Sequence, residues 1–208
     1  MEEEPTIFGR GTKSCFISEE YKLCFINIPK NASTTIRTTL KLEHCQYSDN
    51  YKDYKKIIVI RDPITRIVAG YNEILKLRRD GAFAETQRTN FYKYFKVRHD
   101  IPKSFDLFLD YIKNNLYDDH LIQQSFFLKY KGLSIDDIDY VIDFKNLNEE
   151  LQKIIDLYNI KCPKIIRRQV GSTNVKRALK PILGKYQKKI RAIYSKDFEL
   201  YNKVLNNN

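Results

Sequence analysis

Two short and almost continuous apolar runs, each followed at once by a proline-containing turn and a helix-like segment, constrain the fold of this chain most strongly. The first run covers residues 23–28 and the second covers residues 57–60. Strands that are covered on both faces of a parallel sheet read as continuous apolar runs, because neither of their sides meets water. The two runs therefore predict buried strands that each lead through a turn into a helix.

Helical spacing of apolar residues follows the second run. Asp62 is placed to cap a helix whose first residue is Pro63. The apolar stripe of this helix consists of Ile64, Ile67, Val68, Tyr71 and Leu75. Further along the chain, Ser104 is expected to cap another helix.

The second half of the chain predicts one more strand and two more helices. Residues 139–144 read as a strand, and Asn146 with Glu149 resembles a capping box at the start of the next helix. One continuous last helix is expected over about residues 185–205. This order predicts an α/β fold, a P-loop-like three-layer sandwich with a mostly parallel central sheet flanked by helices.

The length of 208 residues suits one domain with a substantial core. We expect a single domain over residues 1–208, with residues 1–20 and 206–208 at its periphery. No run of about twenty apolar residues occurs, and the amino terminus is acidic, unlike a secretory signal. The sequence therefore predicts a soluble, cytoplasmic protein without a membrane span.

The formal net charge of +11 favours anionic partners, whether nucleotide, acidic glycan, nucleic acid or membrane surface. Lysines that are spread over solvated faces give the same net charge, so the charge alone does not identify a partner, and individual positions are needed for that. The four cysteines form no CxxC pair and no Cys/His cluster with zinc spacing. The sequence thus predicts free thiols and no metal site.

The segment after the first run combines a lysine with a series of small polar residues. It reads Pro29, Lys30, Asn31, Ala32, Ser33, Thr34, Thr35. If Ser33 caps the helix that follows, free amides, hydroxyls and the helix dipole together form a seat for a phosphate-like anion. The alternative is that Pro29 only ends a strand, Lys30 is solvated and the Ser-Thr series is an ordinary cap.

Arg61 follows the second run, so a planar and permanently charged guanidinium is expected at the carboxyl end of a second strand. Ligands of open α/β sheets bind beyond these strand ends. Both segments carry a basic residue at that point, Lys30 and Arg61, so we expect the ligand chemistry of the chain there. Asp62 reads as a cap, although an acidic residue there also fits the magnesium-organising aspartate of a nucleoside triphosphatase.

These two segments, in this order, resemble the sulfotransferases that use 3′-phosphoadenosine 5′-phosphosulfate (PAPS), especially the carbohydrate-modifying branch. In that family a Pro-Lys loop binds the 5′-phosphosulfate, and an Arg-Asp-Pro segment holds the 3′-phosphate. Weaker matches are Asp119-His120 followed by Gln123-Gln124, the late strand and turn at residues 139–147, and the closing helix at residues 194–201.

The resemblance implies a role for each matching residue. Lys30 would contact the bridging oxygen as sulfate leaves, residues 31–35 would form the amide and hydroxyl cradle, and Arg61 would bind the 3′-phosphate. A polar, basic loop closing over the donor would include Thr173, Lys176 and Arg177. The donor co-substrate would be PAPS, with no metal required.

One departure from the family concerns the 3′-phosphate. The family places a serine eight residues after this arginine, and this chain has Ala69 there. The loss of a hydrogen bond to a charged group costs about 1.5 to 3 kcal/mol, or about ten- to a hundred-fold in affinity. Thr65 lies one helical turn earlier on the same face, so we expect it to replace the missing hydroxyl.

The implied reaction needs a general base near the acceptor hydroxyl. His44 lies between the two donor segments, and His120 lies in the weaker family-like stretch. We rank His44 before His120, with a structural role open for both. The acceptor is expected to be a hydroxyl-bearing small molecule or a glycan. The aromatic and basic residues 83–99 either line its groove or form an ordinary insertion.

Two other functions remain open from the sequence. The first is a phosphate-loop kinase or nucleotide hydrolase that uses Lys30 and Asp62, although the glycine-rich GxxxxGK[ST] loop is absent. The second is a non-catalytic basic module that binds acidic polymers. No nucleic-acid-binding motif occurs in the sequence, so nucleic acid is not an expected partner.

Overall fold

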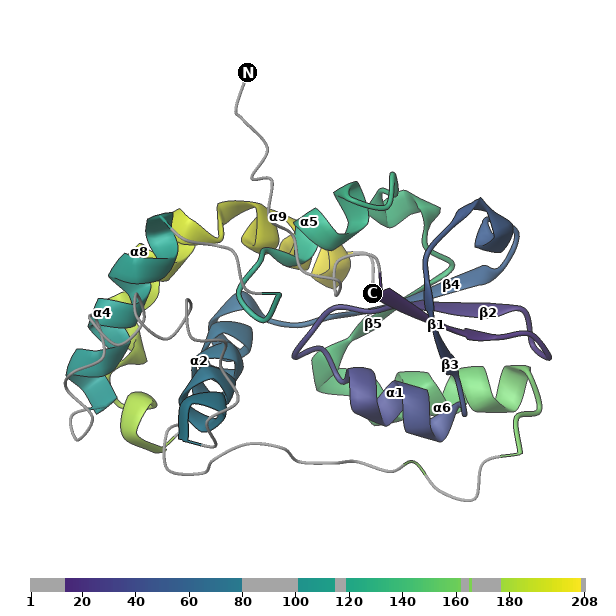
Figure 1. Cartoon of the computed structure of the whole chain (residues 1–208), viewed down its shortest axis with the longest axis horizontal. Helices are drawn as coiled ribbons and strands as arrows, with labels where there is room; N and C mark the ends of the chain where they lie inside the picture. The colour runs from purple at the N-terminus through teal and green to yellow at the C-terminus, as the bar shows by residue number, and fades with distance from the viewer. Residues whose placement is uncertain (1–13, 80–100, 115–118, 162–164, 166–176, 207–208) are drawn as a thin grey trace. The chain divides into compact units, whose positions relative to one another are not determined.

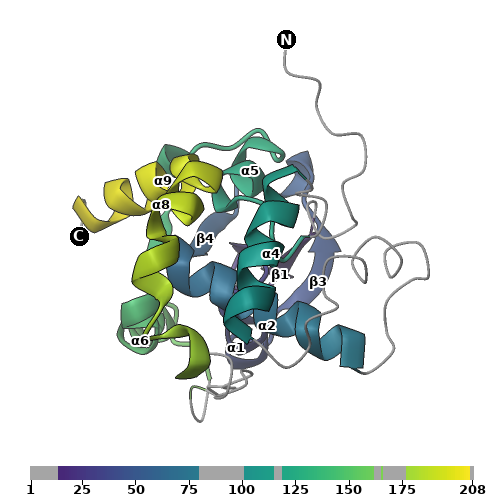
Figure 2. The same cartoon turned by 90° about the vertical axis from the view of Figure 1, so that its left-hand side faces the viewer.

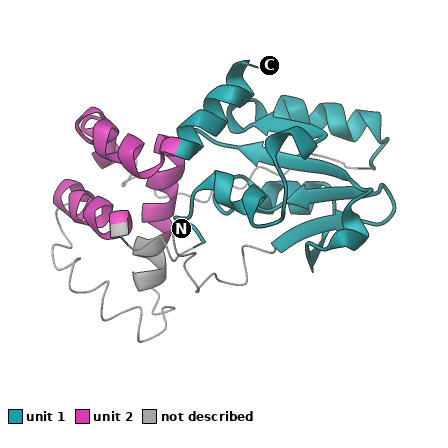
Figure 3. Ribbon diagram, turned by 90° about the horizontal axis from the view of Figure 1, so that it is seen from above, with its two compact units in different colours: residues 1–62, 117–169, 196–208 teal, residues 63–116, 170–195 magenta. Residues whose placement is uncertain are grey.

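The computed structural model describes most of the chain, in five segments (Figure 1). They are residues 14–79, 101–114, 119–161, 165 and 177–206. The chain divides into two compact units (Figure 3). The sheet unit comprises residues 1–62, 117–169 and 196–208, and the helical unit comprises residues 63–116 and 170–195. The single domain over residues 1–208 remains a prediction.

A five-stranded sheet in the order β3-β1-β2-β4-β5 forms the centre of the sheet unit (Figure 1). Its strands are β1 (Ser14–Ser18), β2 (Leu23–Ile26), β3 (Glu43–Gln46), β4 (Lys55–Ile60) and β5 (Tyr140–Asp143). Strand β1 is antiparallel to β2 and β3, whereas β2, β4 and β5 pair in parallel. The sheet is therefore mixed, and only β1 runs against the common direction.

Helices cover both faces of this sheet. They are α1 (Ser33–Thr39), α5 (Gln124–Lys129), α6 (Leu147–Leu157) and α9 (Ser195–Asn206). One face packs Phe25 and Ile57 against α1 and α6, and the other packs Ile26 and Ile58 against α5 and α9. Neighbouring strand residues point to opposite faces, so apolar residues at every position are buried. This confirms the three-layer α/β sandwich predicted from the apolar runs.

Strand β1 lies within the sheet, which corrects the expected peripheral position of residues 1–20 for this segment. Cys15 is fully buried, and Phe16 and Ile17 are buried on opposite faces. Only three apolar residues occur together here, and polar residues flank them. The segment is buried because it pairs with β2 and β3, and such pairing leaves little signal in so short a sequence.

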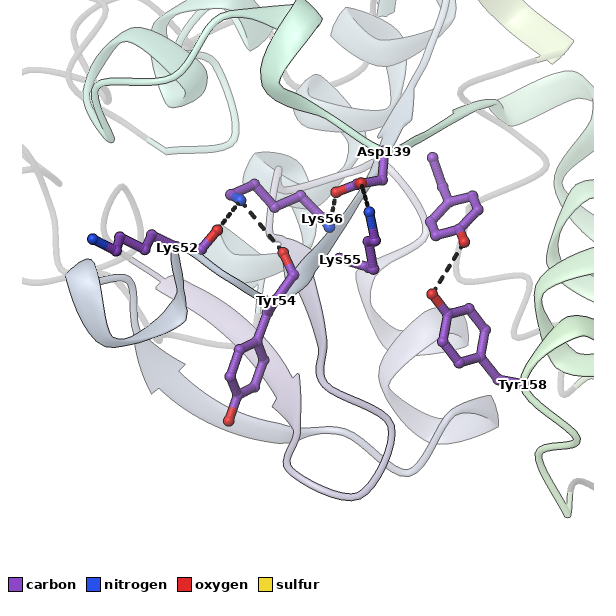
Figure 4. Close-up of polar contacts among 7 residues, drawn as sticks. Lys52, Tyr54, Lys55, Lys56, Asp139 and Tyr158 are labelled. Atoms are coloured by element: carbon purple, nitrogen blue, oxygen red, sulfur yellow. Dashed lines mark hydrogen bonds and ion pairs between the residues drawn. The ribbon is translucent and has the colours of Figure 1, made fainter.

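Asp139 fixes the register between β4 and β5 at the ends where these strands begin (Figure 4). Its two carboxylate oxygens accept hydrogen bonds from the Lys56 backbone N–H at 2.8 Å and from Lys55 Nζ at 2.7 Å. Ile60 consequently pairs with Asp143 at the opposite ends of the strands. The carboxyl ends of β4 and β5 therefore lie at the same level.

Three packed helices form the described core of the helical unit (Figure 2). They are α2 (Pro63–Arg79), α4 (Ile101–Asn114) and α8 (Leu183–Ile193). The ring of Tyr71 in α2 lies 5.1 Å from that of Phe105 and 4.9 Å from that of Phe108, centroid to centroid. The ring of Tyr186 in α8 lies 5.4 Å from that of Phe105. Buried aromatic contacts thus hold these helices together.

Several predicted helix boundaries differ from the structure. Ser104 lies inside α4, where it is buried, because apolar spacing continues back to Ile101. Asn146 precedes α6 but makes no side-chain cap. The expected single last helix is two helices, α8 and α9, separated at Tyr194. Three short 3-10 turns complete the described elements: η1 (Asp49–Tyr51), η2 (Ile135–Asp137) and η3 (Phe144–Asn146).

Candidate functional site

The loop between β2 and α1 contains two residues with left-handed backbone, Lys30 (φ 71°) and Ala32 (φ 63°). Such a backbone costs about 1 to 3 kcal/mol at a residue other than glycine, and it persists where surrounding contacts enforce it. Alternating backbone conformations of this kind turn amide groups toward one side and form anion-binding concavities. The predicted donor loop therefore has backbone strain of the type found at ligand sites.

Ser33 is the first residue of α1 and does not cap it, contrary to the expectation from the sequence. Ala32 occupies the N-cap position, and no side chain caps the helix. The Ser33 hydroxyl contacts Asn27 Oδ1 at 2.5 Å and the Ile28 carbonyl oxygen at 3.1 Å, donating to these acceptors. Because its proton is used inside the protein, Ser33 can offer an anion its backbone amide.

The remaining polar side chains of the loop divide into buried and exposed ones. Asn31 is fully buried, Thr35 is buried, and Thr34 is exposed. Asn31 Oδ1 has no hydrogen-bond partner among the described residues, whereas its Nδ2 donates to the Val59 carbonyl oxygen at 2.7 Å. Asn31 therefore attaches the loop to β4, and Thr34 is the loop threonine whose hydroxyl is accessible.

Arg61 lies beside this loop, as predicted from the two strand ends. Its Nη1 donates to the carbonyl oxygen of Lys30 at 2.9 Å, and its guanidinium lies 4.3 Å from the centre of the Phe144 ring. The face of an aromatic ring attracts the positive charge of a guanidinium, and this group gives up water easily because it is only weakly hydrated. The structure thus brings the two predicted cationic residues, Lys30 and Arg61, to one edge of the sheet.

Gln124, at the start of α5, connects the segments that follow β2 and β4. It is fully buried, and its Oε1 accepts from Asn31 Nδ2 at 2.5 Å and from the Arg61 backbone N–H at 3.0 Å. Its Nε2 donates to the Arg61 carbonyl oxygen at 2.8 Å. The sequence analysis gave Gln124 no role. The available signal was a pair of amide residues, Gln123 and Gln124, directly after the apolar pair Leu121 and Ile122.

A chain of hydrogen bonds links His44, on edge strand β3, to the same loop. His44 Nε2 lies 3.0 Å from Ser14 Oγ, and Asn27 Nδ2 donates to Ser14 Oγ at 3.1 Å. Asn27 Oδ1 in turn accepts from Ser33. His44 also packs edge-on against Phe16, at 5.5 Å between ring centroids. The sequence analysis missed Ser14, because it follows Thr12 and Lys13 in a short polar stretch that carries no recognisable pattern.

The other predicted site residues lie elsewhere in the chain. His120 is half-buried in a turn of the sheet unit. Thr65 is exposed and Ala69 half-buried, one turn apart on α2 of the helical unit, and Arg177 is exposed in the same unit. Thr173 and Lys176 lie outside the described residues, as do residues 83–99.

Two further features concern cysteines and metals. Cys15, Cys24 and Cys45 are free thiols, with the Sγ atoms of Cys15 and Cys45 2.9 Å apart. Burial and the contact with Cys15 raise the pKa of Cys45 to about 12, which disfavours its thiolate. Within the described segments, no three His, Cys, Asp or Glu residues are placed to hold a metal ion, and no helix is long and apolar enough to cross a membrane.

The comparison with protein families gives one match. The model of the sulfotransferase family matches residues 39–203, a span that contains His44, Arg61, His120 and Gln124. The match begins after the loop at residues 29–35, so the structure of that loop is an independent observation. No curated protein and no solved structure matches the chain. Because the family model covers most of its length, the chain belongs to the sulfotransferase family.

Proposed function

We propose that this sulfotransferase moves a sulfuryl group from PAPS to the hydroxyl group of a carbohydrate or another small acceptor. The observation that carries the proposal is the contact between Arg61 and the carbonyl oxygen of Lys30. This contact joins the Arg61 side chain to the backbone of Lys30, whose own conformation is left-handed, and it supports a shared role of the two residues. A donor with phosphate groups at both ends of a nucleoside requires this combination of charges and amides.

Positioning and charge stabilisation carry most of the proposed reaction, as in phosphoryl transfer. The acceptor oxygen forms a bond to the donor sulfur as the bond between sulfur and the bridging phosphate oxygen breaks. Lys30 stabilises the negative charge that develops on this oxygen. The acceptor proton passes to His44, and the products are a sulfate ester and 3′-phosphoadenosine 5′-phosphate (PAP).

Ser14 sets the orientation in which His44 can act as the base. When Nε2–H of neutral His44 donates to Ser14 Oγ, the lone pair on Nδ1 is free to take a proton. The amide of Asn27 fixes Ser14 from the other side. His44 thus has the two features that a general base needs, an accessible ring and a partner that orients it.

The test of this proposal is calorimetry with PAP, followed by sulfate transfer from labelled PAPS to a panel of sugars and simple alcohols. Lys30→Ala is expected to lower the transfer rate by about a hundred-fold or more, the scale of losing a group that stabilises the transition state. Lys41→Ala is the matched control, because Lys41 is an exposed lysine whose backbone is also left-handed (φ 52°). Equal transfer rates in these two variants would contradict the role of Lys30.

The same assays separate the two alternative functions. ATP turnover that requires magnesium would identify a kinase or hydrolase that uses Asp62, whereas PAPS turnover in the presence of a chelator excludes it. Binding to an acidic polymer that survives Lys30→Ala, with no group transfer, would identify a non-catalytic basic module.

A further inference from the structure

Gln124 joins loops that lie far apart in the sequence. Its side-chain oxygen accepts hydrogen bonds from Asn31 at 2.5 Å and from the Arg61 amide at 3.0 Å, and its nitrogen donates to the Arg61 carbonyl at 2.8 Å. The side chain is fully buried. One amide group therefore sets how the loop after β2 lies against the segment after β4.

An amide side chain satisfies these three partners together in a single charge-neutral group. Its oxygen has two lone pairs, used here by two donors, and its NH₂ group supplies the proton that the Arg61 carbonyl accepts. An apolar residue at position 124 leaves the Arg61 amide and carbonyl without this partner in a buried environment. A carboxylate supplies the acceptor but no donor.

Asp197 of α9 holds the backbone of Gln124. Its Oδ2 accepts from the Gln124 amide at 2.9 Å, and its Oδ1 accepts from the Ser125 amide at 3.1 Å and the Ser125 hydroxyl at 3.2 Å. Gln123, the N-cap residue of α5, makes no side-chain cap of its own. The fully buried Asp197 therefore caps α5 from a different helix.

We propose that Gln124 is the positioning residue of the donor site, and that Asp197 acts on the site through Gln124. Gln124 fixes Asn31 and the Arg61 backbone, so the amides of the loop and the guanidinium of Arg61 meet the donor at the correct separation. A displacement of about 1 Å in such groups costs about a hundred-fold in rate. This proposal rests on the donor site proposed above.

Gln124→Met tests the proposal, because methionine keeps the length of the side chain and removes its hydrogen bonds. The dissociation constant for PAP and the KM for PAPS are expected to rise by about ten-fold or more. The control is Gln152→Met on α6, which removes an exposed glutamine that pairs with Asp156. All measurements are made below the unfolding temperature of the least stable variant.

A purely structural role gives a different result. In that case Gln124→Met lowers the unfolding temperature but binds PAP as tightly as the wild type, and the proposal is wrong. Wild-type protein that binds no PAP contradicts the donor assignment itself. Wild-type binding together with an unaffected Gln124→Met variant contradicts the positioning role alone.

Gln124→Glu supplies a second measurement that is independent of side-chain length. A protonated carboxyl group can accept and donate as the amide does, whereas the carboxylate can only accept. The ratio of PAP dissociation constants between this variant and the wild type is therefore expected to fall as the pH is lowered from 8 to 5. A ratio that stays constant over this range would overturn the proposed role of the Gln124 donor.

Asp197→Asn tests the second part of the proposal. This variant is expected to weaken PAP binding in the same direction as Gln124→Met, and the double variant should be little weaker than Gln124→Met alone. Asp136→Asn is the control, since Asp136 forms an exposed ion pair with Lys203 of α9, the helix that contains Asp197. Full additivity of the two changes would contradict an effect of Asp197 through Gln124.

Discussion

Arg61 donates a hydrogen bond from Nη1 to the carbonyl oxygen of Lys30 at 2.9 Å, so one predicted donor-binding residue holds the backbone of the other. The guanidinium also stacks on Phe144, the residue that follows β5. Arg61 therefore connects the ends of three neighbouring strands, β2, β4 and β5. The guanidinium group of Arg61 therefore already makes a hydrogen bond and an aromatic contact within the protein.

Arg61→Lys is expected to weaken PAP binding by about ten- to a hundred-fold, the cost of a lost hydrogen bond to a charged group. A lysine keeps the positive charge but loses the planar fork and the stacking on Phe144. The dissociation constant is measured by calorimetry. Arg37→Lys is the control, because Arg37 is exposed and also lies over an aromatic ring, that of Phe16. Equal losses in both variants would contradict a specific contact between Arg61 and PAP.

His44→Ala is expected to lower kcat by about a hundred- to ten-thousand-fold, the usual contribution of a general base. The affinity for PAP should change little, because the base contacts the acceptor. Single-turnover transfer from labelled PAPS measures the chemical step. His120→Ala in the same assay tests the second histidine, and a larger loss there would exchange the two roles.

Ser14→Ala removes the partner that orients His44 Nε2. We expect a smaller loss of kcat than in His44→Ala, and no further loss when the two changes are combined, since both act on one group. The combined variant is compared with the single variants in a double-mutant cycle. Independent effects would mean that Ser14 acts on the loop through Asn27 and not on His44.

Ala69→Ser is expected to tighten PAP binding by about ten-fold or more, because it restores a hydroxyl for the 3′-phosphate. Thr65→Ala should weaken binding by a similar factor, since we propose that the Thr65 hydroxyl takes the place of the missing serine. Calorimetry with PAP and with adenosine 5′-phosphate, which lacks only the 3′-phosphate, separates the 3′-phosphate contact from the rest. If neither substitution changes PAP affinity, the assignment of this face of α2 to the 3′-phosphate is wrong.

The apolar runs predicted the sandwich because burial on two faces leaves a strong mark in the sequence. Phe25 and Ile26 belong to different cores, as a strand between two helical layers requires. Strand β1 left no such mark. Its apolar run has only three residues, Cys15 to Ile17, and its place in the sheet comes from pairing with β2 and β3. Tertiary context, and not local pattern, decided its place.

The candidate site was predictable where charge and strand ends coincide, as at Lys30 and Arg61. The hydrogen-bonded residues behind them were not, because their partners lie far along the chain. Gln124 contacts Asn31 across 93 positions, and Asp197 reaches Gln124 across 73. A single sequence shows that such residues are polar, but it does not show which of them are buried together.

Ala32→Val is expected to destabilise the protein by about 1 to 3 kcal/mol, because a β-branched residue adopts a left-handed backbone poorly. Ala32→Gly should keep the loop intact, since glycine accepts this conformation without a steric cost. Urea unfolding of both variants measures the effect, with Ala192→Val at an exposed position of α8 as the control. A valine cost no larger at position 32 than at 192 would show that the loop can change its backbone conformation.

Lys131, a half-buried residue shortly after α5, provides a test of how burial changes a pKa. Burial lowers the pKa of its ammonium group to about 8, although nearby Cys15, Cys24 and Asp119 act in the opposite direction. The unfolded chain keeps the proton up to the ordinary value of 10.5. Between these values the unfolded state binds more protons, so the free energy of unfolding should rise with pH over this range.

Lys131→Met removes this titration and keeps an apolar stem of similar length. The variant is expected to be more stable than the wild type at pH 7, where the buried ammonium carries its full desolvation cost, and the difference should shrink as the pH rises from about 8 toward 10.5. Urea unfolding at pH 7, 8.5 and 10 measures the difference, and other titrating groups cancel between the two proteins. Lys129→Met, an exposed change at the end of α5, is the control for replacing a lysine by methionine. A stability difference for Lys131→Met that does not change with pH would show that Lys131 keeps its ordinary pKa in the folded protein.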